Sequence, residues 1–137
     1  KNYEKKILEK EMYFEEQFLV MNEFIKSWKI SKKEEILNLN KKFGALKSKA
    51  FPGRAAILIK LLDLNQDNIL CVYEKPKSPK IGHFIPGTKI PILSDELLFK
   101  DTKSKSPIIN FAWHISKEIK TYLSENNFKG KIVNIIE

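Results

Sequence analysis

The chain has 137 residues, of which 42% are hydrophobic and 31% charged, a composition typical of one globular domain that buries its own core. No apolar run approaches the roughly 20 residues that a membrane span requires, and no signal peptide is recognisable, so we expect a cytoplasmic protein. Cys71 is the only cysteine, which excludes an internal disulfide and leaves no expected metal site. Because the first residue is Lys1 rather than Met, we expect the chain to be part of a longer polypeptide.

The net charge of +8 raises the question of a nucleic-acid partner. The lysines, however, are spread through every segment, and Arg54 is the only arginine. Such a chain has little of the bidentate base-reading capacity that arginine supplies, so a solvated lysine-rich surface is the simpler interpretation. A basic nucleotide- or nucleic-acid-binding module without catalytic activity stays as the alternative function.

Hydrophobic residues recur at intervals of three, four and seven between Tyr3 and Ile25, which predicts a long amphipathic helix to about Trp28. Its length indicates a helix that connects to or packs against something outside the α/β unit, whereas for its inner half we expect packing over the core. Ser31 followed by Glu34 matches a capping box and predicts the start of a second helix. We therefore expect a connecting helix at residues 1–30 and a folded domain at residues 31–137.

Strands and helices alternate along the rest of the chain. In order, we predict a strand at 45–49, a helix at 54–64, a buried strand at 69–73 with an inert Cys71, a loop at 75–88, an edge strand at 89–93, a short helix from Ser94 to about Phe99, a strand at 107–113, a helix at 115–126 and a strand at 132–136. This alternation predicts an α/β fold: a Rossmann-like three-layer domain with a mainly parallel sheet and an added long N-terminal helix.

Ligands of such folds bind outside the carboxyl ends of the strands, where two polar features stand. The first turn contains Pro52, Gly53 and Arg54 and leads into a helix N-terminus, so it could hold a phosphate. Glu74 ends the next strand and could accept hydrogen bonds from ribose hydroxyls. An ordinary strand–helix turn and a solvated Glu are the structural alternatives. The GxGxxG fingerprint is absent, so a third possibility, an NAD-dependent enzyme, is the weakest.

Two further stretches contain distinctive residues. The first, with His83, Phe84, Pro86, Gly87 and Thr88, has a tight Pro-Gly turn, and we expect it to project near the same rim of the sheet; the alternative is that Pro-Gly only turns the chain into the next strand. The second is Trp113-His114 at the end of a predicted strand, suited to a base or sugar ring; core packing and helix capping are the alternatives. No nucleophile with an orienting base and acid can be assembled, so we predict no catalytic residue.

Four segments resemble one known family, the C-terminal domain of S-adenosylmethionine-dependent sugar-nucleotide C-methyltransferases. The segment from Gly82 to Ile92 is similar to its G-x-Y-x-P-G-T/S-x-I-P-I motif, and Phe111 to His114 to its L-P-W-N. The segments 52–58 and 72–75 resemble its first turn with helix and the V-x-D-x end of its second strand. The chain departs from the family at Ala50, Ile57, Leu58, Ala112 and His114.

The resemblance implies a Rossmann-like domain that faces the substrate in a bacterial enzyme that methylates a carbon of a nucleotide-linked deoxysugar. It implies that S-adenosylmethionine is bound by a central domain and zinc by an N-terminal domain, both outside these 137 residues. We therefore expect the chain to bind no cofactor, to position the sugar nucleotide beside the S-adenosylmethionine-binding domain of the same chain, and not to catalyse alone. The residues expected to bind this substrate are Pro52, Gly53, Arg54, Glu74, His83, Phe84, Pro86, Gly87, Thr88, Trp113 and His114.

Overall fold

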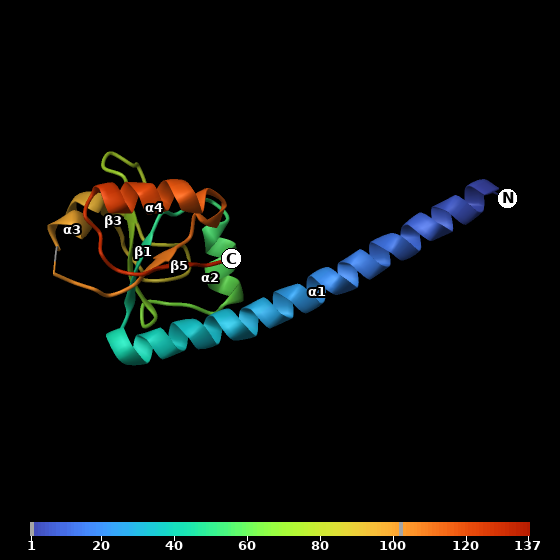
Figure 1. Ribbon diagram of the computed structural model, residues 1–137, viewed down its shortest axis with the longest axis horizontal. Helices are drawn as coiled ribbons and strands as arrows, with labels where there is room; N and C mark the ends of the chain where they lie inside the picture. The colour runs from blue at the N-terminus through green and yellow to red at the C-terminus, as the bar shows by residue number, and fades with distance from the viewer. Residues whose placement is uncertain (1, 102) are drawn as a thin grey trace.

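A five-stranded sheet forms the centre of the molecule in the computed structural model, which describes residues 2–101 and 103–137 (Figure 1). The strands are β1 (Leu46–Lys49), β2 (Ile69–Glu74), β3 (Ile92–Ser94), β4 (Ile108–Asn110) and β5 (Ile132–Asn134). Their order is β3-β2-β1-β4-β5, and all four neighbouring pairs are parallel. This confirms the predicted Rossmann-like α/β fold.

Helices cover both faces of the sheet. Helix α1 (Asn2–Phe43) and helix α2 (Ala55–Leu61) pack on one face, where a core cluster joins Ile36 of α1 to the buried residues of α2 and of the strands. Helix α3 (Asp95–Lys100) and helix α4 (Ser116–Glu125) pack on the other face. A short 3-10 helix, η1 (Trp113–Ile115), precedes α4. Helices on both faces bury most of the apolar run of β2, although Leu70 near its start is 54% exposed.

Helix α1 is one continuous helix of 42 residues, so the predicted break after residue 30 is wrong. Ser31 lies inside the helix and is exposed, so it caps nothing. The junction Lys29-Ile30-Ser31 contains no Gly or Pro that would end a helix. The backbone N–H groups that a capping box would satisfy can donate instead to carbonyls of the preceding helical turn. Whether residues 1–30 and 31–137 act as separate functional units stays a prediction.

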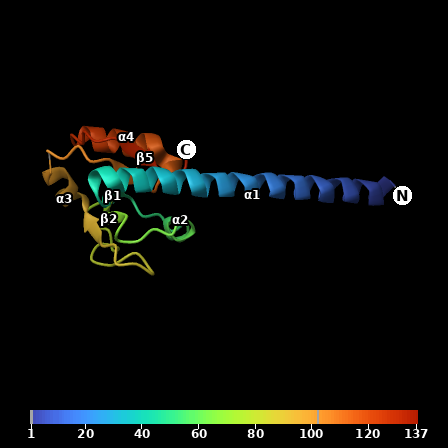
Figure 2. The same cartoon turned by 90° about the horizontal axis from the view of Figure 1, so that it is seen from below.

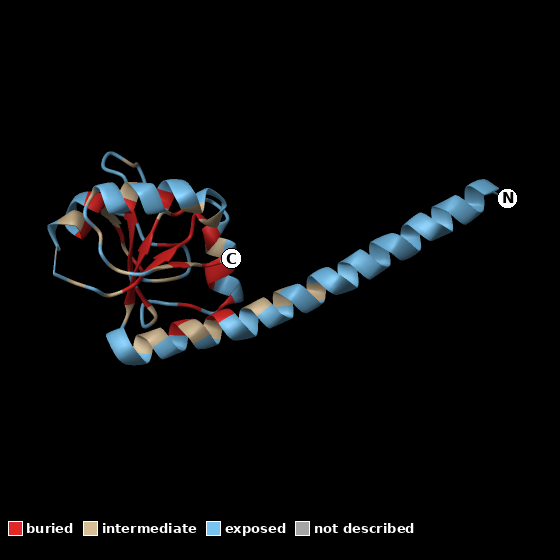
Figure 3. Ribbon diagram, in the orientation of Figure 1, coloured by how far each residue is buried: buried red, intermediate tan, exposed pale blue. Residues whose placement is uncertain are grey.

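Only the C-terminal half of α1 contacts the sheet. The Trp28 indole N–H donates to the carbonyl of Ile135 (2.8 Å), the Lys32 ammonium to that of Asn134 (2.9 Å), and Ile36 is fully buried. The N-terminal half projects away from the domain in both views (Figures 1 and 2). Colouring by burial shows this half exposed along its length (Figure 3).

The remaining elements differ from prediction mainly at their ends. The Pro-containing segment pairs as a strand only from Ile92, and β3 is an edge strand, as its proline predicts. The strand expected at 107–113 ends at Asn110, because the Asn110 side chain bonds the backbone N–H of Ala112 (2.9 Å) and turns the chain into η1. Cys71 is buried as expected, and this burial raises the pKa of its thiol.

Candidate functional site

The order of the strands reverses at one place, between β1 and β4. Strands β2 and β3 follow on one side of β1, and β4 and β5 on the other. The carboxyl ends of β1 and β4 meet there, since the Phe111 backbone N–H donates to the carbonyl of Lys49 (3.1 Å). Chains that leave two adjacent strands toward opposite faces open a crevice, and ligands of α/β proteins bind in it.

The structure brings the first turn and Glu74 together at this edge. One oxygen of the Glu74 carboxylate accepts the backbone N–H of Phe51 (3.0 Å), and the same oxygen lies 3.5 Å from the Lys80 ammonium. Lys80 also donates to the Phe51 carbonyl. Glu74 thus ties the first turn to the proline-containing loop, while Gly53 and Arg54 remain exposed beside it.

Pro86, Gly87 and Thr88 lie elsewhere, so the prediction that they share this rim is wrong. The backbone N–H of Lys89 donates to the side chain of Gln66 (3.2 Å), which precedes β2 at the amino edge of the sheet. The three residues line a cavity of about 470 Å³ that runs along α2 from Ala56 to Lys60 and on to Leu64. A parallel β3 must start from the amino side, so the chain has to carry this turn away from the carboxyl ends.

The Pro-Gly-Thr motif has a clear local role. Gly87 has a φ of 77°, a conformation that glycine adopts without strain, and the Thr88 N–H donates to the Ile85 carbonyl (3.0 Å). The Thr88 hydroxyl donates to that same carbonyl (2.9 Å) and accepts the N–H of Ile90 (3.1 Å). The motif therefore closes a tight turn, and its polar groups are satisfied within the turn.

His83 and Phe84 lie on the segment that leads from the carboxyl edge of the sheet to the turn at Pro86 and Gly87. The carbonyl of His83 accepts the N–H of Ile92 (2.9 Å), and Phe84 forms an antiparallel bridge with Pro91. Both side chains are exposed. Since β3 runs from Ile92 to Ser94, the pairing with Ile92 places His83 beside the start of this edge strand, away from the β1–β4 crevice.

Trp113 and His114 follow β4, as expected, and lie at the carboxyl edge. Their rings meet edge to face, 5.4 Å between centroids. Trp113 is half-buried against the core cluster of the α1–α2 face, and His114 is exposed. The capping alternative for His114 is wrong, because no side chain caps the N-terminus of α4.

A buried ion pair at the end of β1 escaped the sequence analysis. The Lys49 ammonium lies 2.9 and 2.8 Å from the two carboxylate oxygens of Asp95, and both residues are 1% exposed. The Tyr122 hydroxyl donates to Asp95 (2.7 Å). Burial, this hydrogen bond and the nearby negative charge raise the pKa of Tyr122. These contacts fasten β1, α3 and α4 to one another just below the carboxyl edge.

A period-two pattern could have revealed this pair. Lys47 and Lys49 alternate along β1 and therefore share one face of a buried strand, which lysines do only when they are paired. Lys47 lies 3.7 Å from Asp101, and Lys49 meets Asp95, at the two ends of α3. The signal was hidden because lysines are so numerous in this chain.

Comparison with known families matches nearly the whole chain, residues 5–136, to the family described as the C-methyltransferase C-terminal domain. The chain belongs to this family. No curated protein matches it. The assignment confirms the family that the four sequence segments indicated. The matched range also includes most of α1, which the resemblance alone had not covered.

Within residues 2–101 and 103–137, no group of three His, Cys, Asp or Glu side chains could hold a metal ion. Over the same residues, no helix is long and apolar enough to cross a membrane. The Lys49 ammonium donates to both carboxylate oxygens of Asp95 and to the Tyr73 carbonyl (3.5 Å).

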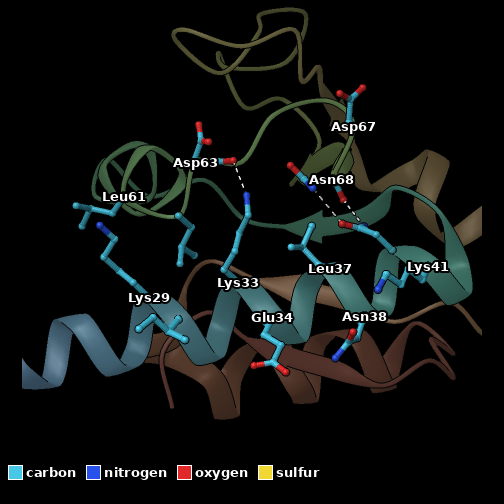
Figure 4. A pocket seen from close by; sticks show the side chains of 13 residues that line it. Lys29, Lys33, Glu34, Leu37, Asn38, Lys41, Leu61, Asp63, Asp67 and Asn68 are labelled. Carbon is cyan, nitrogen blue, oxygen red and sulfur yellow. Dashed lines mark hydrogen bonds between the residues drawn. The ribbon is translucent and has the colours of Figure 1, made fainter.

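A cavity of about 940 Å³ lies on the α1–α2 side and reaches the amino edge, away from the predicted rim (Figure 4). Three of its polar side chains are hydrogen-bonded: Lys33 donates to the Asp63 carbonyl (2.7 Å), and the Asn68 amide donates to the side-chain oxygen of Asn40 (3.1 Å). These bonds fasten α1 to the connection between α2 and β2. The groove therefore follows the line along which α1 packs against this connection.

Proposed function

We propose that this domain binds and positions a nucleotide-linked deoxysugar for a C-methyltransferase, while S-adenosylmethionine is bound by another domain of the same polypeptide. The supporting observation is membership of the C-methyltransferase family, combined with a crevice at the carboxyl ends of β1 and β4. The domain contributes binding and orientation, which alone can supply a large part of a rate enhancement.

The roles proposed for single residues follow from their placement at the carboxyl edge. Arg54 is exposed beside the first turn and offers a planar, permanently charged group for a diphosphate. Glu74 is held in place by Phe51 and Lys80 through one oxygen, so its second oxygen can accept a ribose hydroxyl. Trp113 presents a partly exposed ring on which a base or sugar can stack. The turn at Pro86, Gly87 and Thr88 would serve indirectly, by shaping the hairpin.

Isothermal titration calorimetry with the 137-residue chain tests this proposal, using UDP, dTDP and a dTDP-linked deoxysugar as probes. We expect at least one of them to bind, and S-adenosylmethionine not to bind. The variant Arg54→Ala should weaken binding by roughly 10- to 100-fold, because a charge-assisted hydrogen bond contributes about 1.5–3 kcal/mol.

Lys60→Ala is the matched control for Arg54→Ala. Lys60 also lies on α2 and is exposed, but it stands near the opposite end of the helix, so its loss removes the same charge without touching the carboxyl edge. Equal weakening by both variants would mean that only the net charge matters. Tight binding of random oligonucleotides that collapses with salt would favour a nucleic-acid module instead.

A further inference from the structure

The projecting half of α1 exposes more apolar surface than an isolated domain tolerates. Within residues 12–21, seven of the ten side chains are large and apolar, and each is at least 59% exposed. The three rings among them, Tyr13, Phe14 and Phe18, alone expose on the order of 300–450 Å². The largest apolar patch on a typical monomer is about 300–600 Å², and four aliphatic side chains add to this one. A patch of this size marks an interaction surface.

The apolar side chains surround the helix instead of forming one stripe. At about 100° per residue, the only polar side chains of this stretch, Glu15, Glu16 and Gln17, point in three separate directions. No wide polar face remains for solvent. A helix that is apolar all round is one that a folded body encloses.

A second copy of the chain cannot cover this surface as a two-helix coiled coil. The 3-4 spacing of Phe14, Phe18, Met21 and Ile25 would form the seam, and such a seam covers the a, d, e and g positions. Met12, Tyr13, Leu19 and Val20 then fall at the outward b and c positions and stay in water. The charges also oppose parallel pairing, because residues 11–25 contain four Glu and no Lys.

The same apolar spacing continues into the established contact between α1 and the sheet. Trp28 follows Met21 and Ile25 at intervals of seven and three, and it is the first residue of α1 with a hydrogen bond to the sheet. The helix is therefore held rigidly at one end by the α/β unit, and its other end extends beyond that unit (Figure 2). The projecting half of α1 is therefore placed to contact a second folded domain.

We propose that residues 3–25 of α1 are the docking surface for the folded domain that precedes α1 in the same polypeptide, which encloses this helix on more than one side. The family description supports this occupant, since a C-terminal domain follows other parts of its enzyme. The inference rests on the proposed function for what the preceding domain does, while the docking surface itself follows from the exposed side chains. It assigns α1 the task of fixing the distance and orientation between the two domains.

Photo-cross-linking in the full-length protein tests the inference. Phe14 is replaced by p-benzoylphenylalanine, and the cross-linked peptides are identified by mass spectrometry. We expect cross-links from position 14 to residues that precede Lys1, within one chain, so the mass on a denaturing gel stays that of a monomer. The matched control places the same group at Leu97, a half-exposed apolar residue on α3, and should give no such product.

Several results would overturn the inference. Cross-links between two copies, seen as a doubled mass, would assign the surface to a second chain. Absence of cross-links from position 14, or a reading frame without a folded domain before α1, would remove the proposed occupant. The readout needs neither ligand nor methyl transfer, so a protein that binds no sugar nucleotide yet cross-links as expected would refute only the proposed function.

Discussion

The two halves of α1 share one helix and one apolar spacing but have opposite surroundings. From Trp28 onward, apolar and even charged side chains are buried against the sheet, and Lys32 and Ile36 are the most deeply covered. Before residue 22, every described residue of the helix is exposed. An apolar pattern in a helix therefore indicates that the helix packs against another surface. It does not indicate whether the same domain or a different one provides that surface.

The energetic difference between the halves follows from burial. Ile36 lies in a core cluster with residues of α2 and of the strands, so its side chain gains the full transfer free energy. Phe18 has a larger apolar side chain, but it is 63% exposed, so it contributes little to the stability of this chain by itself. Substitutions in the two halves should therefore differ in size although they lie on one helix.

The largest expected effect is that of Ile36→Ala in the docked half. Removing a fully buried isoleucine side chain leaves a cavity and should lower the free energy of unfolding by about 2–5 kcal/mol. Urea titration followed by circular dichroism measures this change. A loss below about 1 kcal/mol would mean that the docked half is not part of the cooperative core.

A smaller loss is expected for Trp28→Phe. The phenyl ring keeps most of the packing but cannot donate to the Ile135 carbonyl, which leaves that acceptor without its partner. The free energy of unfolding should fall by about 1–2 kcal/mol. Hydrogen exchange offers a second measurement: the amides of residues 22–30 should exchange faster in the variant, whereas those of residues 32–40 should change less.

The layout of the sheet could be predicted from sequence because each strand and helix has a local signal. The β-favouring run Ile69 to Tyr73 predicted a strand, and the short helix was correctly expected to begin at Ser94, whose hydroxyl accepts the N–H of Glu96 (3.3 Å). The alternation of strands and helices then predicted a mainly parallel sheet. The continuity of α1 could not be predicted in this way, because its cap-like Ser31 motif is overridden by an uninterrupted helical chain on both sides.

The candidate site was only partly predictable, because a sequence motif does not reveal whether its residues lie at the carboxyl edge or the amino edge of the sheet. Glu74 and the first turn were correctly expected at the same edge, since Glu74 ends β2 and the turn leads out of β1. The Pro86-Gly87 turn was misplaced, because the distance that the chain travels back before β3 depends on the length of the hairpin. The alternation of Lys47 and Lys49 indicates lysines that need partners, but it does not identify Asp95, which lies 46 positions from Lys49 in the sequence.

The exposed Ser31 allows a test of the boundary between the two halves. If Ser31 capped a second helix, Ser31→Ala would cost about 1 kcal/mol. In a continuous helix, alanine has the higher helix propensity, so the same change should instead stabilise the chain by up to about 0.5 kcal/mol. The sign of the shift in the urea midpoint therefore decides between one helix and two. A destabilised variant would contradict the continuous α1.

In the 137-residue chain, the smallest effect is expected for Phe18→Ala. The same substitution is the most informative one when this chain is compared with the full-length protein. In the 137-residue chain the ring is mostly in water, so the free energy of unfolding should change by less than about 0.5 kcal/mol. In the full-length protein, where we propose that the ring is enclosed, the same substitution should cost about 3–5 kcal/mol. Denaturant unfolding of both proteins, each with Leu97→Ala as the matched half-exposed control, measures the difference. An equally small effect in both proteins would mean that the projecting half of α1 stays exposed. The two halves of the helix would then differ in burial in the full-length protein as they do in this domain.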